Sequence, residues 1–424
     1  MMATYKHRIV DQLLERKLRS KGAILIEGPK WCGKTTTAEQ SASSIINLDD
    51  PKNLKNNLVM AELSPERLLE GETPRLIDEW QIAPKLWDAI RHHVDHTEGY
   101  GQFILTGSSV PADLSEVIHS GTGRFAWIRM RPMTLFESGD STGEVSLKNL
   151  FDSCMVSGLS DMTIEKLAFL TCRGGWPETV DMDEDVALDP SIDYVEGVIR
   201  RDIIRVDGIQ KQYQRVKSLM RSYARNQGEQ TSYSKISADI SVNETSRISD
   251  ETISSYVSAL KKLFVIEDLP AWNPNLRSKT AIRTADTRYF VDPSIATASL
   301  GIGPGDLIKD PETFGFILET LVIRDLRTYA QSLDGEVYHY RDNMNNECDA
   351  VIHLRDGRYG LIEIKLGGEH LISEGVDSLK SVLNRLDTSK MGEPSFMAVV
   401  TGIGGPSYRR DDGIYIVPIG CLRP

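Results

Sequence analysis

The sequence predicts a multidomain protein of the α/β class, and three observations support this. The chain has 424 residues, which is too long for one hydrophobic core and suggests roughly two to four domains. Residues 1–145 alternate short apolar runs with helix-like segments, as in a parallel sheet whose strands are joined by helices. From about residue 285 onward, strand-like segments dominate around one long helix-like segment, so we expect a second α/β domain there.

Composition narrows the class of protein further. Charged residues make up 26% of the chain and apolar residues 40%, the balance of a globular domain. No apolar run approaches the roughly 18 residues that a membrane span needs, and the N-terminus has no signal-like apolar stretch. The five cysteines are scattered and form no CxxC pair, which favours reduced thiols over a zinc site or a disulfide scaffold. We therefore expect a cytoplasmic protein without membrane contact.

The charge of the chain limits how it could contact nucleic acid. The formal net charge is −12, so any such contact must be local. One basic segment has eight Lys or Arg and two Asp between residues 200 and 225; the basic residues are Arg200, Arg201, Arg205, Lys211, Arg215, Lys217, Arg221 and Arg225. A DNA contact within residues 200–270 and an ordinary solvated helix face both explain this pattern.

The N-terminal elements follow one another in a regular order. Each expected strand is a short apolar run, and Ser64 with Pro65 begins one of the helices. The expected strands are residues 23–28, 44–50, 75–80 and 101–109, and the expected helices are 34–43, 63–71 and 84–96. This alternation predicts a parallel sheet over domain 1–145.

The octet GPKWCGKT lies between the first expected strand and the first expected helix. It matches the G-x-x-x-x-G-K-T pattern of a phosphate-binding P-loop in the context that this motif requires. Its backbone N–H groups would surround the phosphates of ATP, Lys34 would reach the β- and γ-phosphates, and the Thr35 hydroxyl would hold Mg²⁺. The expected nucleotide-binding residues are Gly28, Pro29, Lys30, Trp31, Cys32, Gly33, Lys34, Thr35 and Thr36.

The run RLIDE supplies the acids that such a site needs. Asp78 would join the coordination sphere of Mg²⁺, and Glu79 would polarise the attacking water. Arg124 is a candidate arginine finger; the alternative is an ordinary Arg after a glycine turn. Three hydroxyl residues at the next strand end would bond the γ-phosphate or the water, or simply end the strand: Thr106, Ser108 and Ser109.

The middle of the chain predicts helices. A segment rich in Gly, Ser and Asp, residues 140–165, marks a boundary. Three helices and a strand between about 213 and 270 have the outline of a winged helix-turn-helix. The expected divisions are a P-loop domain 1–145, a helical connector 146–212, a winged-helix-like segment 213–275 and a C-terminal domain 276–424.

The stretch ECDAVIHLRDGRYGLIEIKLG, residues 347–367, predicts a β-hairpin whose register can be deduced. A two-residue turn would place Asp349 opposite Ile364, whereas a three-residue turn with a left-handed Gly357 places Asp349 opposite Glu363. The second register also puts the apolar residues of both strands on one face. These residues are Ala350, Ile352, Leu354, Ile362, Ile364 and Leu366.

At this point the chain resembles a known family, the AAA-type ATPases of bacteria and archaea that carry a C-terminal domain of uncharacterised function. The resembling stretches include GPKWCGKTT, LIDEWQIAPKLWDAIR, GRFAWIRMRPMTLFE, RGGWPE and RYFVDPSIA. Lys30-Trp31-Cys32 departs from the Arg-Gln-Val that is usual there. The resemblance implies ATP binding and hydrolysis, and a C-terminal domain similar to restriction-endonuclease-like, PD-(D/E)xK-type nucleases.

The parts of such a nuclease site occur in the usual order. Glu319 on a helix, Asp349 on one strand and Glu363 on the next would bind Mg²⁺, and Lys365 would position the attacking water. The alternative is a solvated Glu-x-Lys pair in a domain that keeps the fold without catalysis.

These observations predict a Mg²⁺-dependent ATPase that drives or gates a nucleic-acid-related or partner-binding activity. The alternative is a nucleotide-switched module that binds DNA or protein and has a silent nuclease-like domain. Helix 250–263 carries only Lys261 and Lys262 as basic residues, which argues against sequence-specific base recognition. A protein partner and an oligomeric assembly both stay open.

Overall fold

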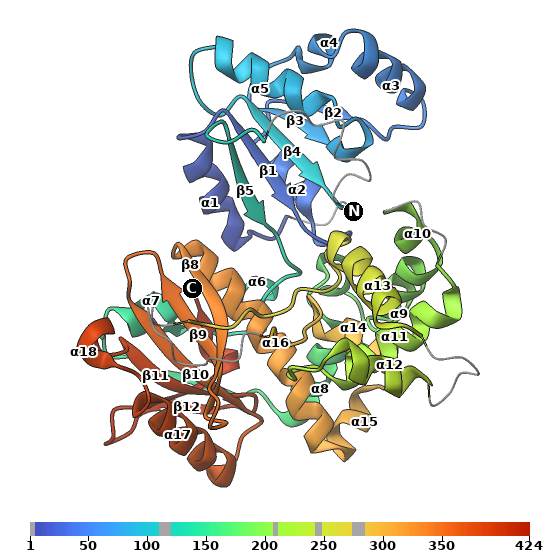
Figure 1. The fold of residues 1–424 in the computed structure, drawn as a ribbon. Coiled ribbons are helices and arrows are strands. Elements are labelled where there is room, and N and C mark those ends of the chain that lie inside the picture. Colours follow the sequence, from blue (N-terminus) through green and yellow to red (C-terminus); the bar gives the residue numbers. More distant parts are fainter. Residues whose placement is uncertain (1–4, 110–119, 207–210, 242–247, 274–284) are drawn as a thin grey trace. The chain divides into compact units, whose positions relative to one another are not determined.

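The computed structural model describes residues 5–109, 120–206, 211–241, 248–273 and 285–424. The chain divides into two compact units (Figure 1). The N-terminal unit comprises residues 1–132, 198–211 and 256–265, and the C-terminal unit comprises residues 133–197, 212–255 and 266–424. Within the described residues, no helix is both long enough and apolar enough to span a membrane.

The N-terminal unit is built on a five-stranded parallel sheet of order β2-β3-β4-β1-β5. Its strands are β1 (Ala23–Glu27), β2 (Ser44–Asn47), β3 (Arg75–Asp78), β4 (Phe103–Gly107) and β5 (Phe125–Arg129). The four strands expected from the sequence are confirmed, and β5 is an additional strand. Its helices are α1 (Ile9–Leu18), α2 (Lys34–Glu39), α3 (Leu54–Leu63), α4 (Glu66–Leu69), α5 (Leu86–His96), η1 (Trp80–Ile82), the π-helical turn η4 (Val198–Asp202) and α10 (Ile203–Arg205).

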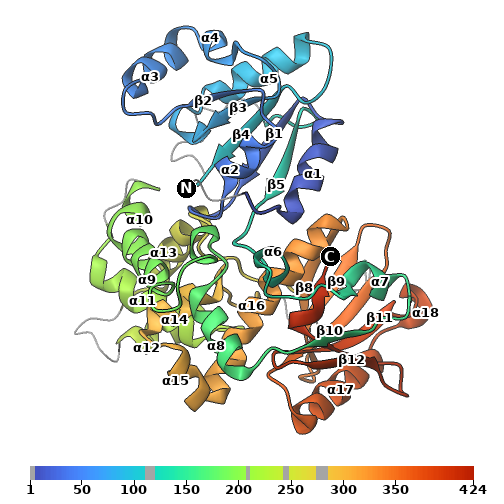
Figure 2. The ribbon, with the colours of Figure 1, turned by 180° about the vertical axis from the view of Figure 1, so that it is seen from behind.

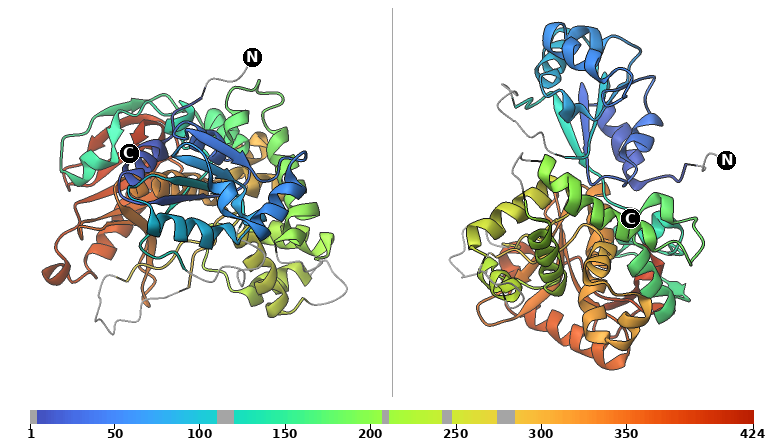
Figure 3. Two further views of the ribbon diagram at one scale, coloured as in Figure 1. Left: turned by 90° about the horizontal axis from the view of Figure 1, so that it is seen from above. Right: turned by 90° about the vertical axis from the view of Figure 1, so that its right-hand side faces the viewer.

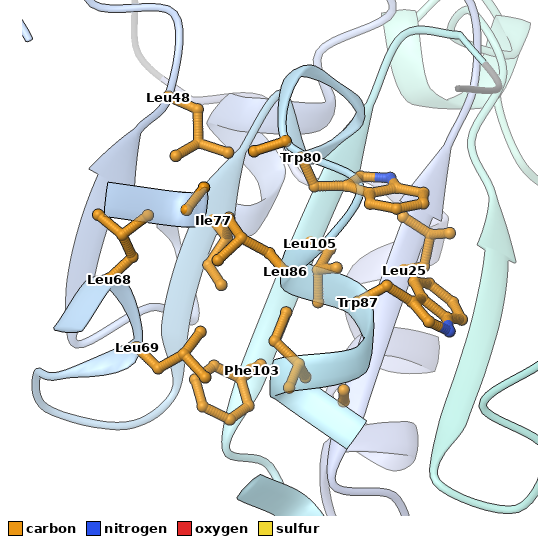
Figure 4. Packing of buried hydrophobic residues seen from close by; sticks show 14 of the residues in the cluster. Leu25, Leu48, Leu68, Leu69, Ile77, Trp80, Leu86, Trp87, Phe103 and Leu105 are labelled. Atoms are coloured by element: carbon orange, nitrogen blue, oxygen red, sulfur yellow. The ribbon is translucent and has the colours of Figure 1, made fainter. Parts of the chain in front are cut away.

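Both faces of the inner strands β1, β3 and β4 are buried, which is why these strands are mainly apolar. On one face Leu25, Ile77 and Leu105 pack against Trp80 and Trp87 (Figure 4). On the other face Ile24, Ile26, Leu76 and Ile104 pack with Leu13 and Leu14 of α1. Figure 3 shows the strands of this unit between helices. The sheet is therefore a rigid platform for the loops at its carboxyl edge.

The C-terminal unit contains a seven-stranded mixed sheet of order β7-β12-β13-β11-β10-β9-β8 (Figure 2). Its strands are β7 (Gly158–Ser160), β8 (Gly335–Arg341), β9 (Glu347–Leu354), β10 (Tyr359–Lys365), β11 (Phe396–Thr401), β12 (Gly405–Arg409) and β13 (Tyr415–Pro418), and a separate pair joins β6 (Val145–Ser146) to β14 (Leu422–Arg423). Strands β10, β11 and β13 are parallel, and the connection from β10 to β11 contains α17 (Glu369–Leu383). A parallel pair needs such a crossover.

Helices make up the rest of the C-terminal unit. They are α6 (Leu135–Ser138), α7 (Leu147–Phe151), α8 (Ile164–Arg173), η3 (Pro177–Thr179), α9 (Asp189–Gly197), α11 (Tyr213–Arg225), α12 (Tyr233–Ser241), α14 (Pro293–Leu300), α15 (Pro304–Lys309), α16 (Pro311–Ser332), α18 (Thr388–Met391) and η5 (Ile419–Cys421). Helix α13 (Asp250–Lys262) contributes its first six residues to this unit and the rest to the other. Two antiparallel bridges, Ile266 with Phe290 and Leu269 with Thr287, follow these three helices α11, α12 and α13 in the chain.

The β9–β10 hairpin has the register expected from the sequence. Leu361 pairs with Val351 and Ile362 with Ala350, the pairing that a three-residue turn produces. Leu354 N–H donates to Arg358 O at 2.8 Å, and Gly357 has a φ of +91°. The left-handed Gly357 adds a third residue to the turn. This fixes which residues of the two strands lie opposite each other.

A buried ion cluster ties four segments of the C-terminal unit together. Arg324 on α16 contacts Asp292 and Asp325 at 2.8 Å each, and all three side chains are almost fully buried. Asp325 also accepts from the backbone N–H of Leu135, and Asp292 from that of Gly175. Burial raises the pKa of Asp325 to about 6, although Arg324 opposes the shift. The guanidinium is therefore the charge that keeps both carboxylates compatible with the core.

Replacing Arg324 by Met should lower the free energy of unfolding of the C-terminal unit by about 3–5 kcal/mol, because two buried carboxylates lose their partner. Chemical denaturation followed by circular dichroism measures the change. Arg358→Met is the matched control, since Arg358 forms exposed ion pairs with Asp152 and Asp356 that are worth about 0–1 kcal/mol. Equal losses in the two variants would contradict the central role of the cluster.

Candidate functional site

The P-loop connects the end of β1 to the start of α2. Gly33 adopts φ +94° immediately before α2, and Trp31 also has a positive φ, so the loop turns tightly between strand and helix. A Cβ on Gly28 would lie 2.1 Å from the backbone oxygen of Met130, so only glycine fits there. Lys34 is buried, and its Nζ donates to Pro29 O at 2.7 Å. The predicted lysine is therefore directed into its own loop.

Arg8 holds this loop from outside the motif. Its Nη1 donates to Cys32 O at 2.7 Å and its Nη2 to Arg131 O at 2.8 Å. The side chain is buried, and hydrogen bonds from a charged donor are stronger than neutral ones. Arg8 thus fastens the loop to the segment that follows β5. The sequence around Arg8 does not indicate this role, because Arg131, one of its two partners, is more than one hundred residues away along the chain.

Asp78 and Thr35, the two side chains expected to bind Mg²⁺, meet at the carboxyl edge of the sheet. Thr35 Oγ1 donates to Asp78 Oδ1 at 2.9 Å. Thr106 on β4, the strand between β1 and β3, also donates to Asp78 Oδ1. Thr106 therefore holds the acid in place, a role different from the phosphate contact considered for it from the sequence.

Glu79 lies beside these residues in an unusual backbone conformation. It adopts φ +55° and ψ +45°, a left-handed geometry that is sparsely populated by non-glycine residues. Its carboxylate accepts from Ser108 Oγ at 3.0 Å and from the side-chain amide of Gln81. Strained residues of this kind cluster at functional sites because the surrounding structure holds them. Ser108 thus orients Glu79, and Gln81 is an orienting residue that the sequence motif did not reveal.

Arg124 lies at the wrong edge of the sheet to act on a nucleotide in its own P-loop. It precedes β5, whose first residue pairs with Ala23 at the start of β1. The five-residue strands place it roughly 16 Å from the carboxyl edge, and its Nε contacts Asp95 at 2.6 Å. Within one chain Arg124 therefore does not reach the P-loop, and the arginine-finger role stays a prediction. Arg129, by contrast with Arg124, is at the carboxyl end of β5, and its guanidinium lies 3.5 Å from the carboxylate of Glu27.

A second group of charged residues gathers in the C-terminal unit around the β9–β10 hairpin. Lys365 Nζ lies 2.8 Å from Glu363 and 3.8 Å from Asp349. Asp349 accepts from the backbone N–H of Ile364 at 2.7 Å, and Glu363 also accepts from Ser378 of α17. Glu363 is buried with 2% exposure, whereas Lys365 keeps 25% and Asp349 17%. The group is therefore closed on one side and accessible on the other.

Glu319 of α16 joins this group through the electrostatic interaction between its carboxylate and that of Asp349. Tyr289 OH donates to its carboxylate at 2.9 Å. Burial, and then the charge of Asp349, raises the pKa of Glu319 well above its usual value. The same two causes raise the pKa of Glu363 to about 8. The structure thus brings Asp349 and Glu363 within 3.8 Å of the Lys365 ammonium group, and Glu319 interacts with them electrostatically.

The geometry of these acids is not that of a ready-made metal centre. Across the part of the chain that the structure describes, no group of three or more His, Cys, Asp or Glu side chains is placed to hold a metal ion. Lys365 supplies the compensating charge instead. A pocket of about 810 Å³ lies beside Glu319; its lining includes Gly228, Thr231, Phe316, Arg341 and Glu347. A Cβ on Gly228 would lie 2.4 Å from Glu319 Oε2, so this wall of the pocket touches Glu319.

Comparison with family models divides the chain into three matched segments. Residues 20–138 match an AAA domain, residues 164–306 match a domain of unknown function (DUF8612), and residues 314–422 match another (DUF4143). No curated protein matches the chain. Residues 20–138 are thus similar to an AAA domain, and the parallel sheet with its P-loop is the α/β fold of a P-loop NTPase.

Two solved structures show distant similarity. The Walker-type ATPase PABY2304 of Pyrococcus abyssi is 16% identical with a TM-score of 0.44, covering 68% of this chain and 94% of its own. A DNA polymerase III gamma subunit-related protein from Thermotoga maritima is 12% identical with a TM-score of 0.22, covering 60% of this chain and 92% of its own. At these values neither similarity bears on function.

Replacing Arg8 by Gln should loosen the P-loop, because each hydrogen bond from a charged group contributes about 1.5–3 kcal/mol. We expect a lower melting temperature and weaker nucleotide binding, measured by differential scanning calorimetry and by isothermal titration with nucleotide. Arg19→Gln is the control, since Arg19 is an exposed arginine that ends α1. Unchanged nucleotide affinity in Arg8→Gln would show that the loop holds its shape without this anchor.

Proposed function

We propose that the chain is a Mg²⁺-dependent ATPase whose hydrolysis cycle drives or gates a nucleic-acid-related or partner-binding activity of the C-terminal unit. The observation that carries the proposal is the contact between Thr35 and Asp78 at 2.9 Å. A hydroxyl and a carboxylate side by side, next to a P-loop, are the oxygen ligands that Mg²⁺ prefers. ATP and Mg²⁺ are thus the cofactors that these residues fit.

Each side chain at this edge has a distinct task in the proposal. The backbone N–H groups of residues 28–36, except Pro29, which has none, surround the phosphates, and Lys34 leaves Pro29 O to pair with them. Glu79, held by Ser108 and Gln81, accepts the proton of the attacking water. Thr106 keeps Asp78 in place. Bound Mg²⁺ would neutralise charge on the transferred phosphoryl group.

Lys34→Ala should abolish ATP turnover, and Glu79→Gln should lower kcat by about 10²–10⁴-fold while leaving nucleotide binding intact, because it removes only the general base. Steady-state phosphate release and nucleotide titration separate the two effects. Lys52→Ala, an exposed lysine outside the loop, controls for the loss of a charge. Undiminished hydrolysis by Lys34→Ala would refute the ATPase assignment.

A metal-dependent nuclease is the second candidate function, for the C-terminal unit. The helix and strand order α16, β8, β9, β10, α17, β11, with β8–β11 adjacent in the sheet, resembles the core of PD-(D/E)xK nucleases. Because Lys365 pairs with Glu363 at 2.8 Å and the acids as placed do not form a metal site in the described residues, Lys365 would first have to leave Glu363. Glu319, Asp349 and Glu363 would then hold Mg²⁺, and Lys365 would place the water. Bound Mg²⁺ would stabilise charge on the cleaved phosphodiester. The alternative is a silent domain in a nucleotide-switched module that binds DNA or protein, with α11, α12, α13 and the following bridges as a winged-helix-like segment.

A cleavage assay with Mg²⁺ or Mn²⁺, with and without ATP, decides between these outputs. The nuclease proposal expects cleavage that Asp349→Ala and Lys365→Ala abolish. Asp356→Ala is the matched control, because Asp356 lies exposed in the turn of the same hairpin. No cleavage under either metal, together with ATP-dependent binding of DNA or a protein, would favour the silent module.

A further inference from the structure

Helix α11 has a basic face in an acidic protein. It carries four basic residues and no acidic residue, although the whole chain has a net charge of −12. Its apolar side, with Val216, Leu219, Met220 and Tyr223, is buried. Lys217, Arg221 and Arg225 are exposed and follow one another at intervals of four residues, which is roughly 6 Å along the helix axis. The exposed face is therefore a regular row of positive charges.

A small pocket opens between this face and α12. Its volume is about 260 Å³, and its lining includes Ser218, Arg221, Arg225, Asp239 and Ile240. Pockets that enclose a whole drug-sized ligand have volumes of about 300–1,000 Å³. A pocket below this range suits a group that a larger molecule presents, and a lining with two guanidinium groups and a hydroxyl suits an anion.

The acid in the lining does not cancel this preference. Asp239 contacts Arg225 Nη2 at 2.5 Å. Burial alone would raise the pKa of Asp239, but the hydrogen bond from Arg225 keeps it below its ordinary value. Asp239 is thus a carboxylate that fixes one guanidinium. In the described part of the chain Arg221 makes no hydrogen bond or ion pair, so its donors face solvent at the pocket.

We propose that this pocket binds a phosphate of a nucleic-acid backbone, with Arg221 as the principal contact and Arg225 and Lys217 beside it. The proposal rests on the nucleic-acid-related output proposed above and gives it a location. A row of cations repeated at every helical turn matches a polymer with repeated phosphates better than a single small anion. Lys217 forms an exposed ion pair with Glu196 at 3.8 Å, which is weak enough to exchange.

Binding at this face is independent of base sequence. Arginines that contact phosphates position a duplex or a single strand but carry no sequence information. Helix α13, the third of these helices, begins with Asp250 and Glu251, and acids there disfavour close approach to phosphates. The basic row on α11 is therefore the part of residues 200–270 that we assign to nucleic acid.

Fluorescence anisotropy with labelled single-stranded and duplex DNA, without nucleotide and over a series of salt concentrations, tests the proposal. Arg221→Gln should weaken binding several-fold and equally for unrelated sequences, and should reduce the slope of log K against log salt by about 1. Arg221→Lys should retain the slope, because the charge is kept. Arg358→Gln, an exposed arginine of the β9–β10 turn, is the control for a general loss of charge.

Two outcomes would overturn the assignment. One is that the protein binds neither form of DNA at low salt, and the other is that Arg221→Gln and Arg358→Gln change the slope equally. Circular dichroism of each variant verifies folding, and the contrast between Arg221→Lys and Arg221→Gln separates charge from structure. The assay contains no ATP, so Lys34→Ala should bind DNA like the wild type. A failure of the ATPase proposal is therefore distinguishable from a failure of this one.

Discussion

The constraint on which the candidate nucleotide site depends is that parallel strands end at the same edge of a sheet. Strands β1, β3 and β4 deliver the P-loop, Asp78 and Ser108 to one edge. Because β4 lies between the other two, its Thr106 reaches Asp78 while Ser108 reaches Glu79. Burial of both faces of the sheet makes this edge rigid, so the hydroxyl and carboxylate groups are held before any ligand binds.

The same constraint explains which residues sequence reasoning could place. The P-loop and the RLIDE run are local patterns, and each sits at the end of its own strand, so the motif and the position agree. No local pattern shows at which edge of the sheet Arg124 lies. It precedes β5, a strand that was not predicted from the sequence, and it therefore lies at the opposite edge. Arg8 and Gln81 act through contacts that no spacing encodes. Tertiary structure alone identifies them.

In the C-terminal unit, the register of one hairpin could be deduced because two independent conditions selected it. The left-handed Gly357 and the alternation of apolar residues both require the pairing that is observed. The surroundings of the acids could not be deduced, since Tyr289, Gly228 and Ser378 come from segments distant along the chain. Sequence patterns therefore predicted which charged residues would meet, but not how their charges would be balanced.

The balance of charge distinguishes the two sites. Neutral hydroxyls of Thr35 and Thr106 satisfy Asp78, so an arriving cation displaces no positive charge there. The ammonium group of Lys365 lies 2.8 Å from the carboxylate of Glu363. A cation that binds there must compete with this ammonium group or displace it. Burial with mutual repulsion already raises the pKa of both Glu319 and Glu363, so protons compete as well. The P-loop edge is thus closer to a cation-binding state, and cation binding at the C-terminal acids requires Lys365 to leave Glu363.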